Sequence, residues 1–350
     1  MKLAILTGGG DCPGLNNVIR AVVEQGIKKY DDEILGFLYG WKGPIQNLTR
    51  PLTLQDVENI HTEGGTIIKS SRTNPYKVEN GPQTVLDSLN KNKIDCLIAV
   101  GGEDTCGVAN KLFKDFKAPI ICVPKTIDND LNATDQTFGF DTSIQIVSDA
   151  LDRIHTTARS HDRVLVLEVM GRHAGWIAAF GGLAGKADYI LIPEEDINLE
   201  KVTEVVKTRK KEVGYAIIVV AEGAKFGEKE SLKDQELDAF GHVKLGGIGD
   251  RLAKAIEEKT KFETRAMSLG HVQRGGTPTA YDRILGVRYG LKAVDLAHEG
   301  KFGKMVALQG NKIVAVDVSE AVGTLKTLDM NLYNEMKVFF GNEARTKAKA

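Results

Sequence analysis

The sequence predicts an α/β protein with doubly wound, mainly parallel sheets. Short apolar segments rich in β-branched residues alternate along the chain with longer segments of helical spacing. Several of the apolar segments are followed at once by glycine or by charged side chains. Ligands of open parallel sheets bind at the carboxyl ends of the strands. A functional site is therefore expected in the turns that follow these segments.

The composition is that of an ordinary globular protein. The chain has 350 residues, 42% hydrophobic and 27% charged, which is enough for two domains of usual size. The formal net charge of -1 gives no overall field that would favour nucleic acid or an acidic membrane. No apolar run approaches the roughly 20 residues that span a bilayer, and residues 1–6 are too short for a signal peptide. The four cysteines lack metal-site spacing, and three lie in or beside apolar segments as buried thiols do, so we expect a reduced, cytoplasmic protein.

The first predicted strand, residues 2–6, runs into the glycine-rich turn 7–14 and then a helix over 15–28. A strand, a glycine loop and a helix start can hold phosphate on backbone N–H groups. The spacing matches neither Walker A nor GxGxxG, so a plain tight turn is an equal alternative. The segment 64–72 opens with glycines and ends at Arg72, which can clamp a phosphate or remain a solvated charge.

A second unit of strand, turn and helix begins at residue 94. The apolar strand 94–100 is followed by glycines and by two adjacent carboxylates, Glu103 and Asp104. Acids beside a phosphate-binding turn repel the ligand unless a cation bridges them. That favours Mg²⁺, a hard ion that prefers carboxylate, phosphate and water oxygens. Capping of the following helix explains the same two residues equally well.

The segment 124–130 follows the apolar strand 120–123 and holds a cation, a hydroxyl, two carboxylates and an amide. Lys125 can neutralise phosphate charge, and Thr126 can hydrogen-bond to a phosphate or a hydroxyl. Either carboxylate, at 128 or 130, can accept a hydroxyl proton. The alternative is a surface turn in which Asp and Asn bond to the local backbone.

The second half of the chain repeats the alternation of strands and helices, which predicts parallel pairing. Further strands are expected at 33–39, 163–170, 188–192, 215–221 and 263–269, and helices at 142–157, 199–211, 248–259 and 280–298. Functional side chains again follow strand ends, at Arg172, Glu222, His271 and Arg274. The polar segment 223–247 is expected to be a surface insertion, and the tail 342–350 to fray.

Four segments together resemble the phosphofructokinase family: Gly8-Gly9-Gly10-Asp11-Cys12-Pro13-Gly14-Leu15-Asn16, 124–130, Met170-Gly171-Arg172 and 269–276. The match covers nearly the whole chain in order. It implies two similar α/β domains with the active site in the cleft between them. Residues 1–140 and about 279–325 would bind the phosphate donor and Mg²⁺, and residues 141–278 and about 326–350 would bind the sugar phosphate. The implied reaction is phosphoryl transfer to the 1-hydroxyl of fructose 6-phosphate, a step of glycolysis.

The resemblance implies a role for each catalytic position. Asp128 resembles the base that takes the proton of the 1-hydroxyl, with Thr126 and Asp130 orienting substrate and charge. Arg172 resembles the arginine that stabilises the transferring phosphoryl group. Glu103 takes the place of the metal-binding carboxylate. These residue types suit phosphoryl transfer, which depends mostly on positioning and charge stabilisation.

The resemblance also implies binding residues. Gly10 and Arg72 resemble contacts to the donor phosphates. Arg163 and Arg265 resemble arginines that a neighbouring subunit lends to the 6-phosphate, which implies a homo-oligomer, a dimer or a tetramer. Direct contacts to the sugar phosphate are implied at Met170, Gly171, Arg172, Glu222, His271 and Arg274, with Thr126 and Asp128 beside them.

Two departures from the ATP-using members indicate the donor. Those members usually have glycine where this chain has Asp104 and Lys125. Asp104 would fill the space of a nucleotide α-phosphate and repel it, and Lys125 would give pyrophosphate a cationic partner, so both join the catalytic set. The pair resembles the pyrophosphate-dependent branch, which makes fructose 1,6-bisphosphate reversibly. An ATP-dependent enzyme of the family is the alternative. A non-catalytic sugar-phosphate sensor is less favoured, because the catalytic acids and Arg172 are intact.

Overall fold

The computed structural model describes residues 1–225 and 247–341. The chain divides into two compact units: unit 1 comprises Met1–Thr142 and Arg274–Leu325, and unit 2 comprises Ser143–Gln273 and Lys326–Ala350. The expected insertion at 223–247 lies almost entirely outside the described residues, and the tail 342–350 wholly so. Each unit is a mainly parallel sheet with helices packed on it, which confirms the predicted α/β class.

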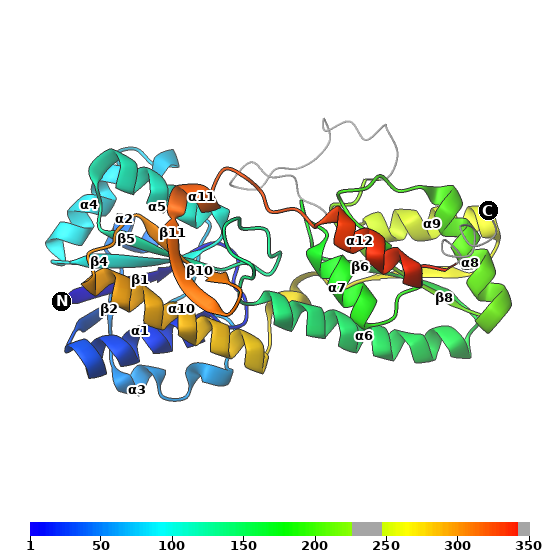
Figure 1. Ribbon diagram of the computed structural model, residues 1–350, viewed down its shortest axis with the longest axis horizontal. Helices are drawn as coiled ribbons and strands as arrows, with labels where there is room; N and C mark the ends of the chain where they lie inside the picture. The colour runs from blue at the N-terminus through cyan, green and yellow to red at the C-terminus, as the bar shows by residue number, and fades with distance from the viewer. Residues whose placement is uncertain (226–246, 342–350) are drawn as a thin grey trace. The chain divides into compact units, whose positions relative to one another are not determined.

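Unit 1 contains a seven-stranded sheet in the order β11-β10-β5-β4-β1-β2-β3 (Figure 1). The five inner strands are parallel: β1 (Lys2–Thr7), β2 (Glu33–Phe37), β4 (Cys96–Gly101), β5 (Ile120–Pro124) and β10 (Lys304–Gln309). The antiparallel strands β3 (Thr49–Leu52) and β11 (Lys312–Asp317) form the edges. The central strands β4 and β5 are buried throughout, which explains their continuous apolar sequence.

Helices cover both faces of this sheet. The helices α4 (Gly81–Lys91) and α5 (Glu103–Phe116) share a core with one face, in which Leu89 and Leu112 pack with Leu97. The long helices α1 (Leu15–Tyr30) and α10 (Ala280–His298) pack together on the other face (Figure 1). Short elements complete the unit: α2 (Lys42–Gln46), α3 (Leu54–Val57), α11 (Val318–Ala321), η1 (Ile60–Thr62) and η2 (Pro75–Lys77).

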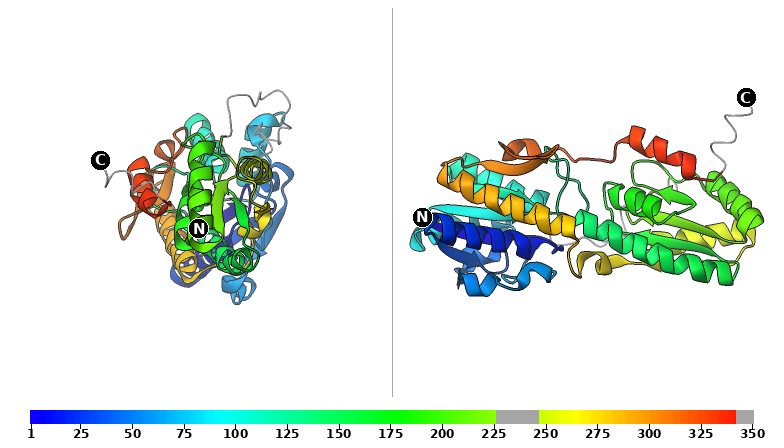
Figure 2. Two further views of the ribbon diagram at one scale, coloured as in Figure 1. Left: turned by 90° about the vertical axis from the view of Figure 1, so that its right-hand side faces the viewer. Right: turned by 60° about the horizontal axis from the view of Figure 1, so that its bottom comes forward.

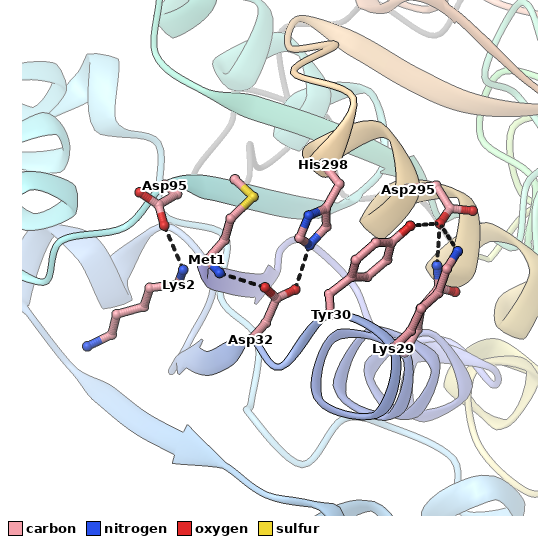
Figure 3. A network of polar contacts seen from close by, with 9 residues as sticks. Met1, Lys2, Lys29, Tyr30, Asp32, Asp95, Asp295 and His298 are labelled. Carbon is pink, nitrogen blue, oxygen red and sulfur yellow. Dashed lines mark hydrogen bonds and ion pairs between the residues drawn. The ribbon is translucent and has the colours of Figure 1, made fainter.

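A polar network fastens α1 to α10 at the amino ends of the strands (Figure 3). The fully buried carboxylate of Asp32 accepts hydrogen bonds from the Met1 nitrogen and from His298 Nε2, both at 2.8 Å. The ring of Tyr30 stacks on that of His298 with 3.7 Å between centroids, and the Tyr30 hydroxyl donates to Asp295 at 2.8 Å. This end of unit 1 is therefore held by charge pairs, away from the turns that follow the strands.

Unit 2 contains a parallel sheet of four described strands in the order β7-β8-β6-β9. The strands are β6 (Val164–Val169), β7 (Tyr189–Leu191), β8 (Ala216–Ala221) and β9 (Thr264–Ser268). The helices are α6 (Phe140–Ser160), α7 (Trp176–Ala184), α8 (Leu199–Val213), α9 (Ile248–Thr260) and α12 (Met330–Met336), with the 3-10 turns η4 (Gly270–Arg274) and η5 (Lys337–Phe339). The first turn of α6 still belongs to unit 1, and the rest of the helix continues into unit 2 (Figure 2).

The predicted strands and helices are all present, with ends within three residues of those expected. The strands β3, β10 and β11 were not predicted. All four cysteines are buried and free, as expected of three of them. Among the described residues, no helix has the length and apolar character to cross a membrane.

Candidate active site

The turns after β1, β4 and β5 meet at one edge of the unit 1 sheet, because these strands are parallel neighbours. The Gly8 N–H donates to the Val100 carbonyl at 2.9 Å, and the Lys125 N–H donates to the Gly101 carbonyl at 2.9 Å. The structure thereby brings together most of the residues predicted to bind the donor or to react: Gly10, Glu103, Asp104, Lys125, Thr126, Asp128 and Asp130.

The glycine loop after β1 is held by the segment that precedes Arg72. The Gly9 N–H donates to the Ser71 carbonyl at 3.0 Å, and Ser70 Oγ donates to the Gly9 carbonyl at 2.5 Å. The exposed Arg72 therefore follows directly on a segment that is bonded to the loop, and its role as a donor contact stays a prediction. The N–H groups of Gly8 and Gly9 are both bonded to protein carbonyls. These two amides are thus committed within the protein, unlike those of a backbone phosphate cradle.

Two cationic side chains contact the carbonyl groups of this glycine loop. Lys125 is only 4% exposed, and its ammonium donates a short hydrogen bond to the Gly10 carbonyl. Burial lowers the pKa of Lys125. Arg274 also lies here, with Nη1 donating to the Asp11 carbonyl at 3.3 Å. A buried cation directly beneath a strand-end loop is suited to bind a phosphate anion.

The segment after β5 has a fixed backbone. Thr126 Oγ1 accepts a hydrogen bond from the Asp128 N–H at 3.1 Å. Thr137 ties the segment from the other side, since its hydroxyl donates to the Thr126 carbonyl at 2.7 Å and its N–H donates to Asn129 Oδ1 at 3.1 Å. The Asp128 carboxylate is therefore carried by a backbone that neighbouring residues hold in place.

Burial and the nearby Asp128 carboxylate raise the pKa of Asp130 to about 7, and the charge of Glu103 acts in the same direction. The three acids thus interact across the ends of β4 and β5. A carboxyl pair of this kind can divide the tasks of accepting a proton and holding one near neutral pH.

The arrangement of these three acids shows whether Mg²⁺ fits at the ends of β4 and β5. Their mutual repulsion would be relieved by a divalent cation, and Glu103 is exposed at the start of α5 with one oxygen accepting from the Gly323 N–H at 3.3 Å. Within residues 1–225 and 247–341, no three His, Cys, Asp or Glu side chains are arranged to hold a metal by themselves. The site therefore fits a Mg²⁺ ion bound through Glu103 and completed by phosphate and water oxygens.

The turns after β6, β8 and β9 meet at the corresponding edge of the unit 2 sheet. The Glu222 N–H donates to the Val169 carbonyl at 2.8 Å, and the Gly223 N–H donates to the Gly171 carbonyl at 3.1 Å. Gly223 approaches so closely that a Cβ there would lie 1.9 Å from the Arg172 carbonyl oxygen. Backbone bonds thereby assemble the predicted sugar-phosphate residues Met170, Gly171, Arg172 and Glu222. His271 lies in η4, which follows the neighbouring strand β9.

Two buried residues that the sequence analysis missed hold these turns. Gln273 accepts a hydrogen bond from the Met170 N–H at 2.8 Å and donates to Ser143 Oγ at 3.1 Å. Glu168 accepts from the Gly249 N–H at 2.8 Å, at the start of α9. A carboxylate inside an otherwise apolar strand was a usable signal for Glu168, because a buried charge needs partners.

Arg163 and Arg265 lie elsewhere. Arg163 precedes β6 and Arg265 is the second residue of β9, so both are at the amino ends of these strands. Each donates to Glu263 at 2.8 Å. A strand of five or six residues spans roughly 17–20 Å. The structure therefore places these arginines at the edge of the sheet opposite the turn 170–172 of their own chain.

The family to which the chain belongs is shown by comparisons that cover most of its length. The phosphofructokinase family model matches residues 2–297. The chain belongs to the phosphofructokinase family. This family member is 57% identical to the pyrophosphate–fructose 6-phosphate 1-phosphotransferase of Amycolatopsis mediterranei, over 97% of this chain and 100% of that protein. It is 44% identical to the ATP-dependent 6-phosphofructokinase of Mycobacterium bovis, with the same coverage of both chains.

A solved structure agrees with this assignment. The pyrophosphate-dependent phosphofructokinase from Marinobacter aquaeolei is 25% identical to this phosphofructokinase, with a TM-score of 0.81 over 95% of this chain and 86% of that chain. The family predicted from the four sequence motifs is thereby confirmed.

Proposed function

We propose that this protein is a pyrophosphate-dependent 6-phosphofructokinase. It transfers a phosphoryl group from pyrophosphate to the 1-hydroxyl of fructose 6-phosphate, giving fructose 1,6-bisphosphate and phosphate, and it also runs in reverse. The observation that carries the proposal is the pair at the donor edge of unit 1. Lys125 is buried against the glycine loop, while Asp104 is exposed at the start of α5. The relatives named for pyrophosphate use, at 50% to 57% identity, support the same donor.

The residues of unit 1 supply the chemistry. Asp128 accepts the proton of the 1-hydroxyl as the oxygen attacks phosphorus, and Thr126 fixes the Asp128 backbone. Lys125 stabilises the negative charge that develops on the departing phosphate. Mg²⁺, when bound through Glu103, neutralises charge on the pyrophosphate oxygens.

The residues of unit 2 recognise the sugar phosphate. Met170, Gly171, Glu222 and His271 contact it from the bonded turns. Arg172 stabilises the transferring phosphoryl group. In the described part of the chain its Nη1 is buried and has no hydrogen-bond partner, as expected of a donor kept for a ligand.

The enzyme is proposed to be a homo-oligomer in which Arg163 and Arg265 bind the 6-phosphate in a neighbouring subunit. Their place at the opposite edge of the sheet supports this role. Mixing Asp128→Asn chains with Arg163→Ser chains should restore activity, because one mixed site then has an intact Asp128 and an intact Arg163. An absence of recovery after subunit exchange, or full activity of a monomer in light scattering, would contradict it.

The donor is tested by initial rates with fructose 6-phosphate and either pyrophosphate or ATP. We expect efficient turnover with pyrophosphate and little with ATP. The relatives named as ATP-dependent, at 44% identity, support an ATP-dependent enzyme as the second candidate. A preference for ATP would overturn the donor assignment and leave the Asp128 chemistry in place. Turnover with either donor would exclude a non-catalytic sensor.

A further inference from the structure

We propose that Asn129 positions the Asp128 carboxylate, and that its hydrogen bond to Thr137 sets the rate of turnover rather than the affinity for substrate. The inference rests on the proposed function, in which Asp128 accepts the proton of the 1-hydroxyl. Asn129 lies between Asp128 and Asp130 in the sequence, and only 3% of its surface is exposed. Its side chain is bonded within the protein. Any effect of Asn129 on the reaction therefore acts through its neighbours.

The backbone of Asn129 is left-handed, with a φ of 52°. Apart from glycine, asparagine and aspartate adopt this conformation most readily. In an extended chain, the two side chains that flank a residue point to the same face. A left-handed residue between them turns the chain. The directions of the Asp128 and Asp130 carboxylates therefore depend on Asn129 keeping its conformation.

The side chain of Asn129 is held by Thr137. Its Oδ1 accepts a hydrogen bond from the Thr137 N–H at 3.1 Å, and the Thr137 hydroxyl donates to the Thr126 carbonyl at 2.7 Å. Thr137 is fully buried, so the loss of the Asn129 amide would leave a buried N–H without its acceptor. The two bonds reach the chain before and after Asp128. Asn129 and Thr137 therefore act together on the backbone that carries the proposed base.

Thr137 is in turn supported by the core of unit 1. The next residue, Phe138, pairs with Lys125 in a parallel bridge and is fully buried. Its ring meets that of Tyr289, on α10, edge to face with 6.4 Å between centroids. The Tyr289 hydroxyl donates to the Gln136 carbonyl at 2.6 Å. Contacts on both sides of Thr137 thus tie it to a long helix, and rigid support matters because misplacing a reacting group by about 1 Å can cost about 10²-fold in rate.

The test is a kinetic comparison of purified variants with fructose 6-phosphate, pyrophosphate and Mg²⁺. Asn129→Ala removes the acceptor and disfavours the left-handed backbone, so we expect kcat to fall by about 10- to 100-fold. Asn129→Gly keeps the backbone conformation and should lose less. Thr137→Val loses the hydroxyl bond and should also lower kcat, and Thr137→Ser should restore it. The KM of each substrate should stay within about threefold of the wild-type value, because the effect of a base falls mainly on the transition state.

The two residues should also be coupled. In the double variant Asn129→Gly with Thr137→Val, the fall in kcat should be smaller than the product of the two single falls, because both residues act through the same backbone. A fall equal to that product would contradict their joint action.

Asn47 provides a matched control in unit 1. It too is left-handed, with a φ of 52°, and its Oδ1 accepts hydrogen bonds from Ser88 at 3.2 Å and from Asn92 at 2.7 Å. Asn47→Ala should lower the melting temperature and leave kcat unchanged, because these bonds do not involve the segment after β5. A purely structural role for Asn129 predicts the same result for Asn129→Ala. Normal kcat with a lower melting temperature in Asn129→Ala would therefore overturn the inference, as would a rise in KM larger than the fall in kcat.

Calorimetry with fructose 6-phosphate alone gives a readout that does not depend on turnover. Asn129→Ala should bind the sugar phosphate with nearly the wild-type Kd, because the proposed contacts in unit 2 are unchanged. A loss of affinity as large as the fall in kcat would overturn the inference. If Asn129→Ala does not fold, Asn129→Gly and Thr137→Val carry the same comparison. A wild-type enzyme that uses ATP instead of pyrophosphate would reject the proposed donor but not this inference, and the variants would then be compared with ATP.

Discussion

The strand-end turns of the two units are built differently. In unit 1, the turns after β1, β4 and β5 contain buried or closely spaced charges, among them Lys125 and Asp130. In unit 2, the turns after β6, β8 and β9 are joined by backbone hydrogen bonds, by the close approach of Gly223 and by the side chain of Gln273. The charges in the unit 1 turns shift the pKa values of their neighbours. The hydrogen bonds in the unit 2 turns hold the backbone in a fixed position.

The difference matches two chemical tasks. Groups that exchange protons or stabilise developing charge need burial and charged neighbours, because these set the pKa and the strength of each interaction. A surface that recognises a sugar phosphate needs its backbone ordered before binding, because ordering it afterwards reduces affinity. Substitutions in unit 1 should therefore change rate and donor. Substitutions in unit 2, apart from Arg172, should change mainly the KM of the sugar phosphate.

The largest effect is expected at Asp128. Asp128→Asn removes the proposed base and should lower kcat by about 10²–10⁴-fold. Calorimetry should show fructose 6-phosphate bound nearly as in wild type. Asp87→Asn, an exposed carboxylate on α4, is the matched control and should be fully active. Near-native turnover in folded Asp128→Asn would refute the assignment.

The next effect concerns the donor. Asp104→Gly should gain ATP binding, because a like charge beside a phosphate costs several kcal/mol in order of magnitude. Lys125→Gly alone should lose pyrophosphate activity without gaining much with ATP. The double variant should shift the ratio of kcat/KM values from pyrophosphate toward ATP. If Asp104→Gly binds and uses ATP no better than wild type, Asp104 does not exclude the nucleotide.

A third prediction tests buried charge in unit 1 through stability. Asp282, at the start of α10, accepts hydrogen bonds from the Thr142 N–H at 2.8 Å and from Thr142 Oγ1 at 2.5 Å. Burial raises the pKa of Asp282 from 3.8 to about 6. Because the folded pKa exceeds the unfolded one, its stabilising contribution is complete below about pH 4 and is lost as the pH rises through 6.

Asp282→Asn removes this titration. Its free energy of unfolding, relative to wild type, should therefore rise by about 3 kcal/mol between pH 3 and pH 7. Urea denaturation across this range measures the change, and Asp87→Asn should track wild type. If the free energies of unfolding of Asp282→Asn and wild type change in parallel with pH, Asp282 does not titrate in this way.

The smallest effect is expected in unit 2, at Gln273. Gln273→Met removes the hydrogen bond to the Met170 N–H and should raise the KM for fructose 6-phosphate about three- to tenfold. The KM for pyrophosphate should change less. Ser143→Ala keeps the bond to Met170 and should have a smaller effect. Gln25→Met, which loses a partly buried hydrogen bond to Asp295 in unit 1, should lower stability without changing either KM. Equal effects of Ser143→Ala and Gln273→Met would contradict the role of the Met170 bond.

Most of the strands and helices could be predicted because their signals are local. An apolar run such as 120–123 specifies a buried strand wherever it is placed, and the glycine and acidic turns mark where it ends. Two misses have local reasons. Pro51 disfavours a strand, and β3 tolerates it because it pairs on one side only, as an edge. The β10–β11 hairpin had a usable signal in its two-residue turn, Gly310-Asn311.

The sequence by itself determined the α/β class, the family motifs and the residue types of the site, because these depend on short segments. Only the tertiary structure decided which turns meet, since the order β5-β4-β1 follows from pairing between distant segments. It also placed Arg163 and Arg265 at the opposite edge of their sheet, and Arg274 on the glycine loop. The direction and partners of a long side chain depend on neighbours from elsewhere in the chain. The order of motifs along the sequence does not identify those neighbours.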